Sequence, residues 1–160
     1  MSNTGNARRN LEKPVIDLFE AVARQYPGDI KRGQSKENQV PGTQFQFGDL
    51  RVNAPSCYIL IEVESAGGVT NLVKYWYCLE EHKISQPIRL LHIYSLVTDE
   101  SWKSHLDLWR SLSGKMKAAL GNMFVTTDEP YTYKTAEDLD GIVKDFDRIL
   151  KEEFIGNQGK

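Results

Sequence analysis

Residues 58–64 read Tyr-Ile-Leu-Ile-Glu-Val-Glu, and this stretch decides the fold prediction. Its residues are β-branched and apolar enough on both faces to form an interior strand. Gly67-Gly68 ends the strand, and from Val69 to Glu81 apolar residues recur at helical spacing. A second apolar strand follows at 87–96. Because a helix joins the two strands, we expect them to be parallel neighbours in one sheet.

Upstream of this unit, apolar residues at helical spacing predict a helix over 11–26, with Asn10 as its cap and Pro14 in its first turn. The polar stretch 28–42 follows and carries glycines, a proline and several cations. We therefore expect it to be a mobile loop and the main contact for a polyanion. Its cations are Lys31, Arg32 and Lys36.

Between this loop and the interior strand, the apolar period changes to two. The pattern predicts a strand over 43–52 on which Phe45, Phe47 and Asp49 share one face. A turn signal at 53–56 separates this strand from the interior strand. A hairpin would place the two strands side by side, with cross-strand neighbours in contact.

Two helices and a short strand are predicted in the C-terminal part. One helix is expected to be capped by Ser101 and to continue to Leu120, and a short strand over 123–127 follows it. Thr135 with Asp138 three residues later resembles a capping box, which predicts the start of the last helix. The order of elements predicts a mixed α/β sandwich around a small sheet.

Composition limits the kind of protein. A chain of 160 residues predicts a single domain over 1–160. With 20 Lys and Arg against 22 Asp and Glu, the net charge is −2, so any polyanion must be held locally. No apolar run approaches the ~18 residues of a membrane span, so we expect no membrane partner. Cys57 and Cys78 form no CxxC motif and no apolar leader precedes them, which favours a reducing, cytoplasmic setting.

Three carboxylates are predicted to gather at one edge of the sheet. Glu62 and Glu64 are two residues apart on a strand and therefore share a face, and Asp49 ends the apolar face of the preceding strand. Three converging anions repel one another unless a cation offsets them, and hard divalent cations prefer oxygen ligands. The pattern therefore indicates a site for Mg²⁺ or Mn²⁺ with a phosphate substrate. The simpler interpretation is that the strand ends reach water and the carboxylates are merely hydrated.

The longer pattern resembles the PD-(D/E)XK nuclease superfamily, and the resemblance spans 11–96. Gly48-Asp49 looks like the first acidic motif, and Ile61-Glu62-Val63-Glu64 looks like the second. Asn71-Leu72-Val73-Lys74-Tyr75 is similar to the Gln-Leu-x-x-Tyr helix motif of the RecB-type branch. Glu20 lies where an acid of the first helix sometimes joins the site.

This resemblance implies a restriction-endonuclease-like three-layer sandwich. Its core would run helix, three strands, helix and strand, and 97–160 would add a C-terminal helical extension. The implied activity is metal-dependent phosphodiester hydrolysis of nucleic acid, with DNA as the expected substrate and Mg²⁺ or Mn²⁺ as the cofactor.

The resemblance also implies a role for each motif residue. Asp49 and Glu62 would bind the metal ion, and Glu64 would either bind it or act as the general base. The other residues implied are Glu20 as a metal ligand, Lys74 as a catalytic cation and, as substrate contacts together with the basic loop, Asn71 and Tyr75.

Two positions depart from the family pattern. Glu64 stands where the family usually has lysine, and Asn71 stands where the RecB-type branch has glutamine. An acid at the first of these positions is tolerated in some restriction enzymes of the superfamily. Lys74 follows Asn71 by three helical residues, so it could point toward the carboxylates and supply the cation. The alternative is that Lys74 lies on a solvated helix face.

The remaining chemistry-bearing residues are interpreted as structural. His82, His92 and His105 have no metal-ligand spacing with another histidine or cysteine. The aromatic residues 75–77 could stack on bases, although Trp76 fits the apolar face of its helix. An aromatic stripe on the helix after residue 101 could bury against a second copy of the chain, as in a homodimer.

Three functions stay open on the sequence. The leading one is a metal-dependent nuclease. The second is a catalytically inactive protein of the same fold that acts as a binding or assembly module with a protein partner, which Glu64 and the mildly acidic composition favour. The third is a small-molecule sensor or another α/β enzyme, which predicts a large apolar pocket away from Asp49.

Overall fold

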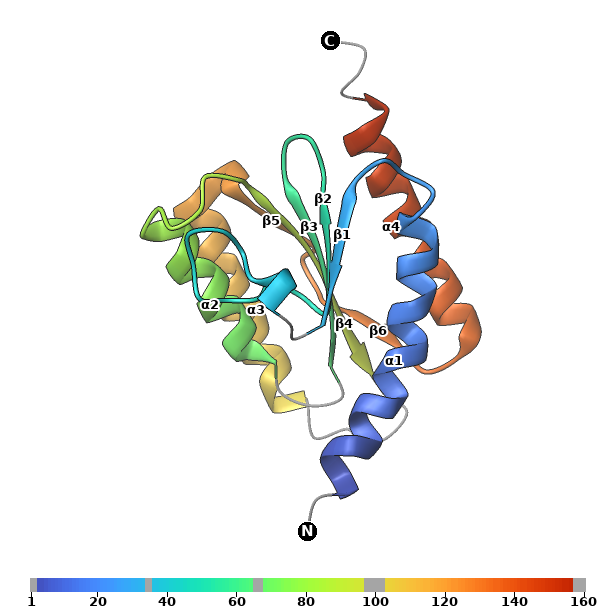
Figure 1. Ribbon diagram of the computed structural model, residues 1–160. Coiled ribbons are helices and arrows are strands. Elements are labelled where there is room, and N and C mark those ends of the chain that lie inside the picture. Colours follow the sequence, from blue (N-terminus) through green and yellow to red (C-terminus); the bar gives the residue numbers. More distant parts are fainter. Residues whose placement is uncertain (1–2, 34–35, 65–67, 97–102, 157–160) are drawn as a thin grey trace.

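The structure is a computed structural model that describes residues 3–33, 36–64, 68–96 and 103–156 (Figure 1). Its helices are α1 (Asn3–Ala23), α2 (Val69–Glu80), α3 (Lys103–Leu120) and α4 (Ala136–Phe154). Its strands are β1 (Asp29–Arg32), β2 (Leu50–Asn53), β3 (Tyr58–Glu64), β4 (Ile88–Ser95), β5 (Phe124–Thr126) and β6 (Tyr131–Tyr133), and its 3-10 turns are η1 (Lys36–Asn38) and η2 (Gly121–Met123). Within these described residues, no helix has the length and apolar character needed to cross a membrane.

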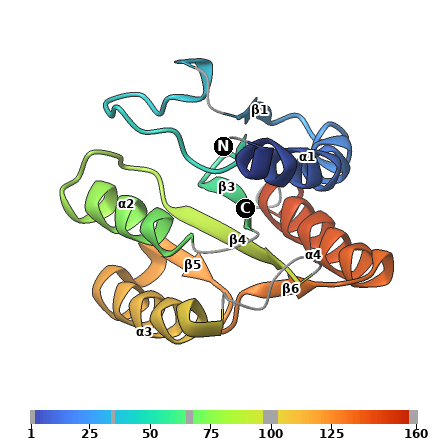
Figure 2. The same ribbon diagram turned by 90° about the horizontal axis from the view of Figure 1, so that it is seen from below.

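A mixed sheet lies between two layers of helices. Helices α1 and α4 cover one face and α2 and α3 cover the other, as the view from below in Figure 2 shows. The strand order is β1-β2-β3-β4-β5, and β6 also pairs with β4. β1, β2 and β3 are antiparallel neighbours, whereas β4 is parallel to β3, β5 and β6. The mixed α/β architecture predicted from the order of elements is therefore present.

The sheet divides the apolar core in two. On the side of α1 and α4, Ile61 of β3 packs with buried residues such as Phe19 and Phe146. On the side of α2 and α3, Leu60 packs with buried residues such as Trp109. Because alternate residues of β3 enter both cores, β3 is the interior strand that its sequence predicts.

The central β3-α2-β4 unit agrees with the prediction. β3 covers the predicted residues 58–64, and α2 ends one residue before the predicted Glu81. β4 lies within the predicted 87–96 and pairs in parallel with β3 from Tyr58↔Ile88 to Glu64↔Tyr94. The apolar runs of these strands are long enough for their period and flanks to identify them.

The predicted strand over 43–52 is wrong for 43–49, because β2 begins only after Asp49. Gly48 has a φ of +77°, a left-handed conformation that interrupts an extended chain. Phe47 is fully buried while Phe45 is 37% exposed, so the two rings do not share a face as predicted. Spacing alone did not reveal this turn, since a glycine between apolar residues is compatible with both conformations.

The predicted basic loop is in part a strand. β1 pairs antiparallel with β2, so Lys31 and Arg32 belong to the edge of the sheet, while residues 34–35 lie outside the described residues. Asn38 of η1 is fully buried and anchors the segment. Lysine and arginine are common on edge strands, which is why their presence resembled a loop.

Helix α1 begins earlier than predicted. It starts at Asn3, so Asn10 is an interior residue and not the cap, and it ends at Ala23 instead of Tyr26. Pro14 lies inside the helix. Proline lacks the N–H that would bond to the carbonyl of residue 10, and the helix continues through the loss of that one bond.

The part of the chain after residue 97 contributes strands as well as helices. β5 falls within the predicted 123–127 and pairs with the first half of β4, whereas the unpredicted β6 pairs with the second half. Three residues are too short to display an alternating pattern. α3 lies within the predicted 101–120, but its expected cap, Ser101, lies outside the described residues.

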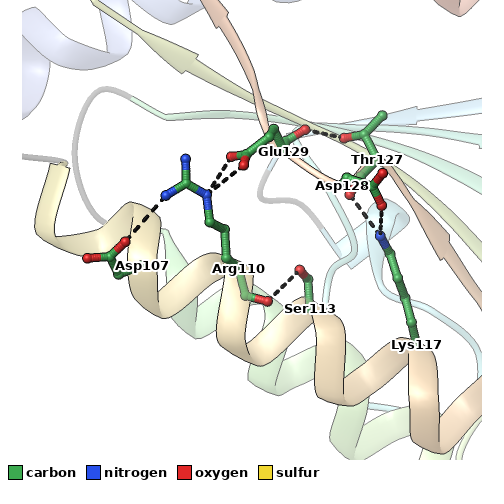
Figure 3. Close-up of polar contacts among 7 residues, drawn as sticks. All are labelled: Asp107, Arg110, Ser113, Lys117, Thr127, Asp128 and Glu129. Atoms are coloured by element: carbon green, nitrogen blue, oxygen red, sulfur yellow. Dashed lines mark hydrogen bonds and ion pairs between the residues drawn. The ribbon is translucent and has the colours of Figure 1, made fainter.

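Ion pairs connect α3 to the turn between β5 and β6 (Figure 3). Arg110 Nε lies 2.7 Å from both carboxylate oxygens of Glu129. Lys117 Nζ donates to the Thr127 carbonyl at 3.0 Å and to Asp128 at 3.3 Å. Exposed pairs of this kind contribute little individually, but together they orient α3 against the edge of the sheet.

The capping box predicted for α4 is present. Thr135 Oγ1 accepts from the backbone N–H of Asp138 at 3.2 Å, and the Asp138 carboxylate accepts from the Thr135 N–H at 3.1 Å.

We expect Thr135→Ala to lower the free energy of unfolding by about 1 kcal/mol in urea denaturation, because it leaves one helix-end N–H without its acceptor. Thr135→Ser retains the hydroxyl and is the control. Equal midpoints for Thr135→Ala and the unmodified protein would contradict the role of the cap.

Candidate functional site

Three polar residues lie near one another at one end of the sheet. Leu50 of β2 lies opposite Ile61 of β3, and the N–H of the preceding Asp49 also donates to the Ile61 carbonyl, so Asp49 lies close enough to Glu62 for its charge to affect that carboxyl. Glu62 in turn lies opposite His92 of β4. Residues opposite one another in neighbouring strands project to the same face, here the face covered by α2 and α3.

A pocket of about 500 Å³ lies where this polar row reaches the surface. It is lined by the carboxylates of Asp49, Glu62 and Glu64 and by the amine of Lys74. The other residues that line it are Glu12, Gly33, Gln44, Phe45, Gln46, Gly48, Val63 and Asn71. The structure therefore brings together the three acids that the sequence predicts to converge.

Asp49 is held through both its backbone and its side chain. Its N–H donates to the Ile61 carbonyl at 2.8 Å, and its own carbonyl accepts from the Gly33 N–H at 3.0 Å. Its Oδ2 accepts from the Val63 N–H at 2.8 Å. A Cβ on the preceding Gly48 would lie 2.7 Å from a backbone oxygen, so only glycine allows this approach. Burial raises the pKa of the Asp49 carboxyl above its ordinary value.

Glu62 is the most deeply buried of the three acids, with 4% of its surface exposed. The hydroxyl of Tyr75 donates to Glu62 Oε1, and the same hydroxyl accepts from the Gly48 N–H at 3.1 Å. Burial, followed by the charge of Asp49, raises the pKa of Glu62 to about 7. Tyr75 is therefore a positioning residue for a carboxyl that is costly to ionise.

Glu64 lies at the N-terminus of α2. Asn71 Nδ2 donates to Glu64 Oε1 at 2.8 Å. Gly68, the N-cap residue of α2, has a φ of +82°, and a Cβ on it would lie 2.6 Å from that same oxygen, so the backbone of Gly68 lies directly against the carboxylate. Burial, with the charge of Asp49 as second cause, raises the pKa of Glu64 to about 7.

Lys74 supplies the positive charge of the pocket. Its Nζ donates to the Gln46 carbonyl at 2.7 Å and lies 3.4 Å from Asn71 Oδ1. It also lies 5.0 Å from the centroid of the Tyr75 ring. Its charge lowers the pKa of each of the three carboxyls, against the larger effect of burial. Of the two sequence interpretations of Lys74, the structure therefore agrees with a place beside the acids.

His92 was missed as a site residue, because its isolation along the sequence suggested a structural role. It is fully buried, and its Nδ1 accepts from the indole N–H of Trp109 at 2.9 Å. A neutral imidazole with this acceptor carries its proton on Nε2, which has no hydrogen-bond partner and lies 3.6 Å from Glu64 Oε1. Burial lowers the pKa of His92 to about 4. The parallel register with Glu62 was the one signal that could have identified it.

The structure does not bring Glu20 to the pocket. Its two carboxylate oxygens form ion pairs with Arg24 at 3.0 Å and with Arg32 at 2.7 Å. Glu12, two helical turns earlier in α1, is the acid of the first helix that lines the pocket. The sequence signal for both residues is the same, an acid on an amphipathic helix, so only the position of α1 distinguishes them.

None of the three basic residues predicted to contact substrate lines the pocket, although the charge of Arg32 lowers the pKa of Asp49. Arg32 is engaged by Asp17 at 2.6 Å as well as by Glu20, and Lys31 lies 3.5 Å from Asp29. Lys36 is exposed on η1. By contrast, Asn71 and Tyr75 both contact site carboxylates. Asn71 donates to Glu64 and Tyr75 donates to Glu62, so these polar groups are engaged by the protein itself.

The donor set suits a hard divalent cation. Mg²⁺ typically uses one or two carboxylates and retains several waters, and Asp49 with Glu62 or Glu64 supplies that number. Two buried carboxyls with raised pKa values also lack the charge compensation that a cation would give. However, among the residues that the structure describes, no group of three or more His, Cys, Asp or Glu side chains is already arranged to hold a metal ion.

The chain matches no protein family, no curated protein and no solved structure with which it was compared. The function proposed below therefore rests on the geometry of the site.

Buried carboxyls make the stability of the metal-free protein depend on pH. The folded pKa of Glu62, about 7, lies above the ordinary 4.5, so the folded state binds its proton more tightly than the unfolded state. This contribution to stability is complete below about pH 4.5 and is lost as the pH rises through 7.

As the pH rises from 5 to 8, we expect the free energy of unfolding of Glu62→Gln to increase by about 1–3 kcal/mol relative to that of the unmodified protein, because the amide never ionises. Urea denaturation in the presence of a chelator measures this difference. Glu80→Gln, which changes an exposed acid on α2, is the control and should show no such trend. Parallel pH curves for Glu62→Gln and the unmodified protein would show that burial of Glu62 has no energetic effect.

Proposed function

We propose that the chain is a metal-dependent nuclease with a restriction-endonuclease-like core. The observation that carries the proposal is the convergence of Asp49, Glu62, Glu64 and Lys74 on one pocket at the end of β3. Phosphodiester hydrolysis needs a cation beside the phosphate, a water activated for attack and a positive group near the developing charge. The four side chains supply ligands, a base and a fixed cation.

The topology supports the proposal. The order α1, β1, β2, β3, α2, β4 is the core order of the PD-(D/E)XK superfamily that the sequence resembles. The first acid directly precedes β2, and the second acidic pair ends β3. All three polar residues of the motif on α2 point to the site, where Asn71 contacts Glu64, Tyr75 contacts Glu62 and Lys74 lines the pocket.

In the proposed mechanism Asp49 and Glu62 would hold Mg²⁺ or Mn²⁺. When bound, such an ion would supply Lewis-acid chemistry at a phosphoryl oxygen and a water of lowered pKa. Glu64, oriented by Asn71, accepts the proton of the attacking water, for which a carboxyl with a pKa near 7 is well matched to neutral pH. Lys74 lines the same pocket and would take the role of the family's lysine by stabilising charge on the phosphate. DNA is the substrate that the resemblance suggests.

Two observations favour a second candidate, a catalytically inactive module that binds or assembles with a partner. The described residues contain no three-acid group already arranged around a metal, and the Glu62 carboxyl is bonded to Tyr75. A sensor with a separate apolar pocket has less support, because the hollow of about 620 Å³ beside the site shares Gln44 and Phe45 with it.

Calorimetric titration with Mn²⁺ alone tests the metal site. We expect the unmodified protein to bind Mn²⁺ more tightly as the pH rises through 7, because carboxyls with raised pKa values must release protons. Comparing buffers of different ionisation enthalpy measures those protons. Asp49→Asn should weaken binding at least tenfold, and Glu80→Gln should leave it unchanged. Absence of Mn²⁺ binding by the unmodified protein would overturn the nuclease proposal.

Cleavage assays test the chemistry separately from metal binding. With Mg²⁺ or Mn²⁺ and labelled DNA, we expect Glu64→Gln to reduce the cleavage rate by about 10²–10⁴-fold, since it removes the proton acceptor. Lys74→Met should reduce the rate while Mn²⁺ binding is retained. Metal binding without cleavage of either DNA or RNA would support the inactive module instead.

A further inference from the structure

Two aromatic rings are exposed next to the carboxylate pocket. Phe45 lies in the segment before β2 and is 37% exposed, and Tyr77 lies on α2 and is 47% exposed. Their ring centroids are 6.0 Å apart at an interplanar angle of 73°. Neighbouring aromatic residues of α2 behave differently, since Tyr75 is fully buried and Trp76 packs against the core. Tyr77 therefore lies on the exposed face of α2, with its ring accessible to solvent.

The backbone that carries the exposed ring of Phe45 is held by a hydrogen-bonded turn. The Phe45 N–H donates to Thr43 Oγ1 at 3.0 Å, and the Phe45 carbonyl accepts from the Val40 N–H at 2.9 Å. The Thr43 hydroxyl also donates to the Val40 carbonyl at 2.9 Å. Gly42, at a φ of +83°, lets this turn lie against the backbone of Lys83. Because this backbone is ordered in advance, less conformational freedom is lost when the ring binds a flat partner.

The two rings line a hollow of about 620 Å³ that adjoins the carboxylate pocket. Gln44 and Phe45 line both spaces. Lys83 lines the hollow, and no ion pair with a described acid engages its amine. Lys74 lies one helical turn before Tyr77 and lines the pocket side. The surface thus combines exposed rings with cations, next to the site proposed to hold a phosphate.

We propose that Phe45 and Tyr77 form a stacking subsite for an unpaired nucleobase of the substrate, with Lys83 beside the adjoining phosphate. The identity of this ligand rests on the proposed function. A base within a duplex has both of its faces covered by neighbouring base pairs, whereas an unpaired base can lie on an aromatic ring. The substrate class that follows is a single strand, or an end or junction with unpaired nucleotides.

Binding of a 12-nucleotide single-stranded DNA carrying 2-aminopurine, in Ca²⁺, tests the subsite. We expect quenching of the 2-aminopurine fluorescence on binding, and weaker binding of the duplex of the same sequence. Tyr77→Ser and Phe45→Ser should each weaken single-strand affinity about 5–100-fold, the range found for removing one stacking partner. Tyr77→Phe should restore both affinity and quenching, and Lys83→Gln should reduce the salt dependence of binding. Val125→Ala, an exposed apolar change on β5, is the control.

The outcomes separate the subsite from the nuclease proposal. Unchanged affinity and quenching in Tyr77→Ser and Phe45→Ser would overturn the subsite, whether or not the unmodified protein binds Mn²⁺ and cleaves DNA. Loss of quenching in these variants, in a protein that binds no Mn²⁺ and cleaves nothing, would support the subsite while the nuclease proposal fails. A change of oligomeric state in sedimentation, with oligonucleotide affinity unaltered, would show that the rings meet a second copy of the chain and would overturn the subsite.

Discussion

The hydrogen bonds that join Asp49 to β3 set the geometry of the whole site. The N–H of Asp49 donates to the carbonyl of Ile61, the residue that already lies opposite Leu50, and the Asp49 carboxylate accepts from the N–H of Val63 on the same strand. These bonds replace what would be the next pairs of a regular hairpin. They fix the first acid beside Glu62 without using a side-chain contact between the two anions, so the repulsion between them is imposed by the backbone.

Electrostatic conflict is the property that this backbone arrangement creates. Glu62 and Glu64 have pKa values near 7 because they are buried beside Asp49, and Lys74 only partly offsets the effect. Groups in such surroundings are common at functional sites, because they can bind a cation or transfer a proton near neutral pH. His92 adds a second buried titratable group whose neutral form is favoured, so the row contains groups shifted in opposite directions.

Sequence patterns predicted the elements that have long apolar repeats and failed where conformation depends on one residue. The bounds of β3, α2 and β4 lie within one or two residues of the predicted ones. The three acids that were predicted to converge all line the pocket. The turn at Gly48 was missed, because glycine in an apolar stretch does not reveal the sign of φ.

The site residues that were missed share a different cause. His92 and Glu12 are placed by strand register and by the packing of α1, and neither is encoded by neighbours in the sequence. Glu20 is the opposite case, because its residue type and its helix fit the prediction. Its carboxylate pairs with Arg32 of β1 instead of lining the pocket.

Helix α2 couples the parts of the site mechanically. Asn71, Lys74 and Tyr75 lie about one turn apart on this helix. Asn71 donates to Glu64, Lys74 donates to the Gln46 carbonyl, and Tyr75 donates to Glu62. A small roll of this helix would therefore shift two carboxyls and the chain before β2 at once. Because the buried face of α2 packs in the core, the packing of that face is coupled to the positions of both carboxyls.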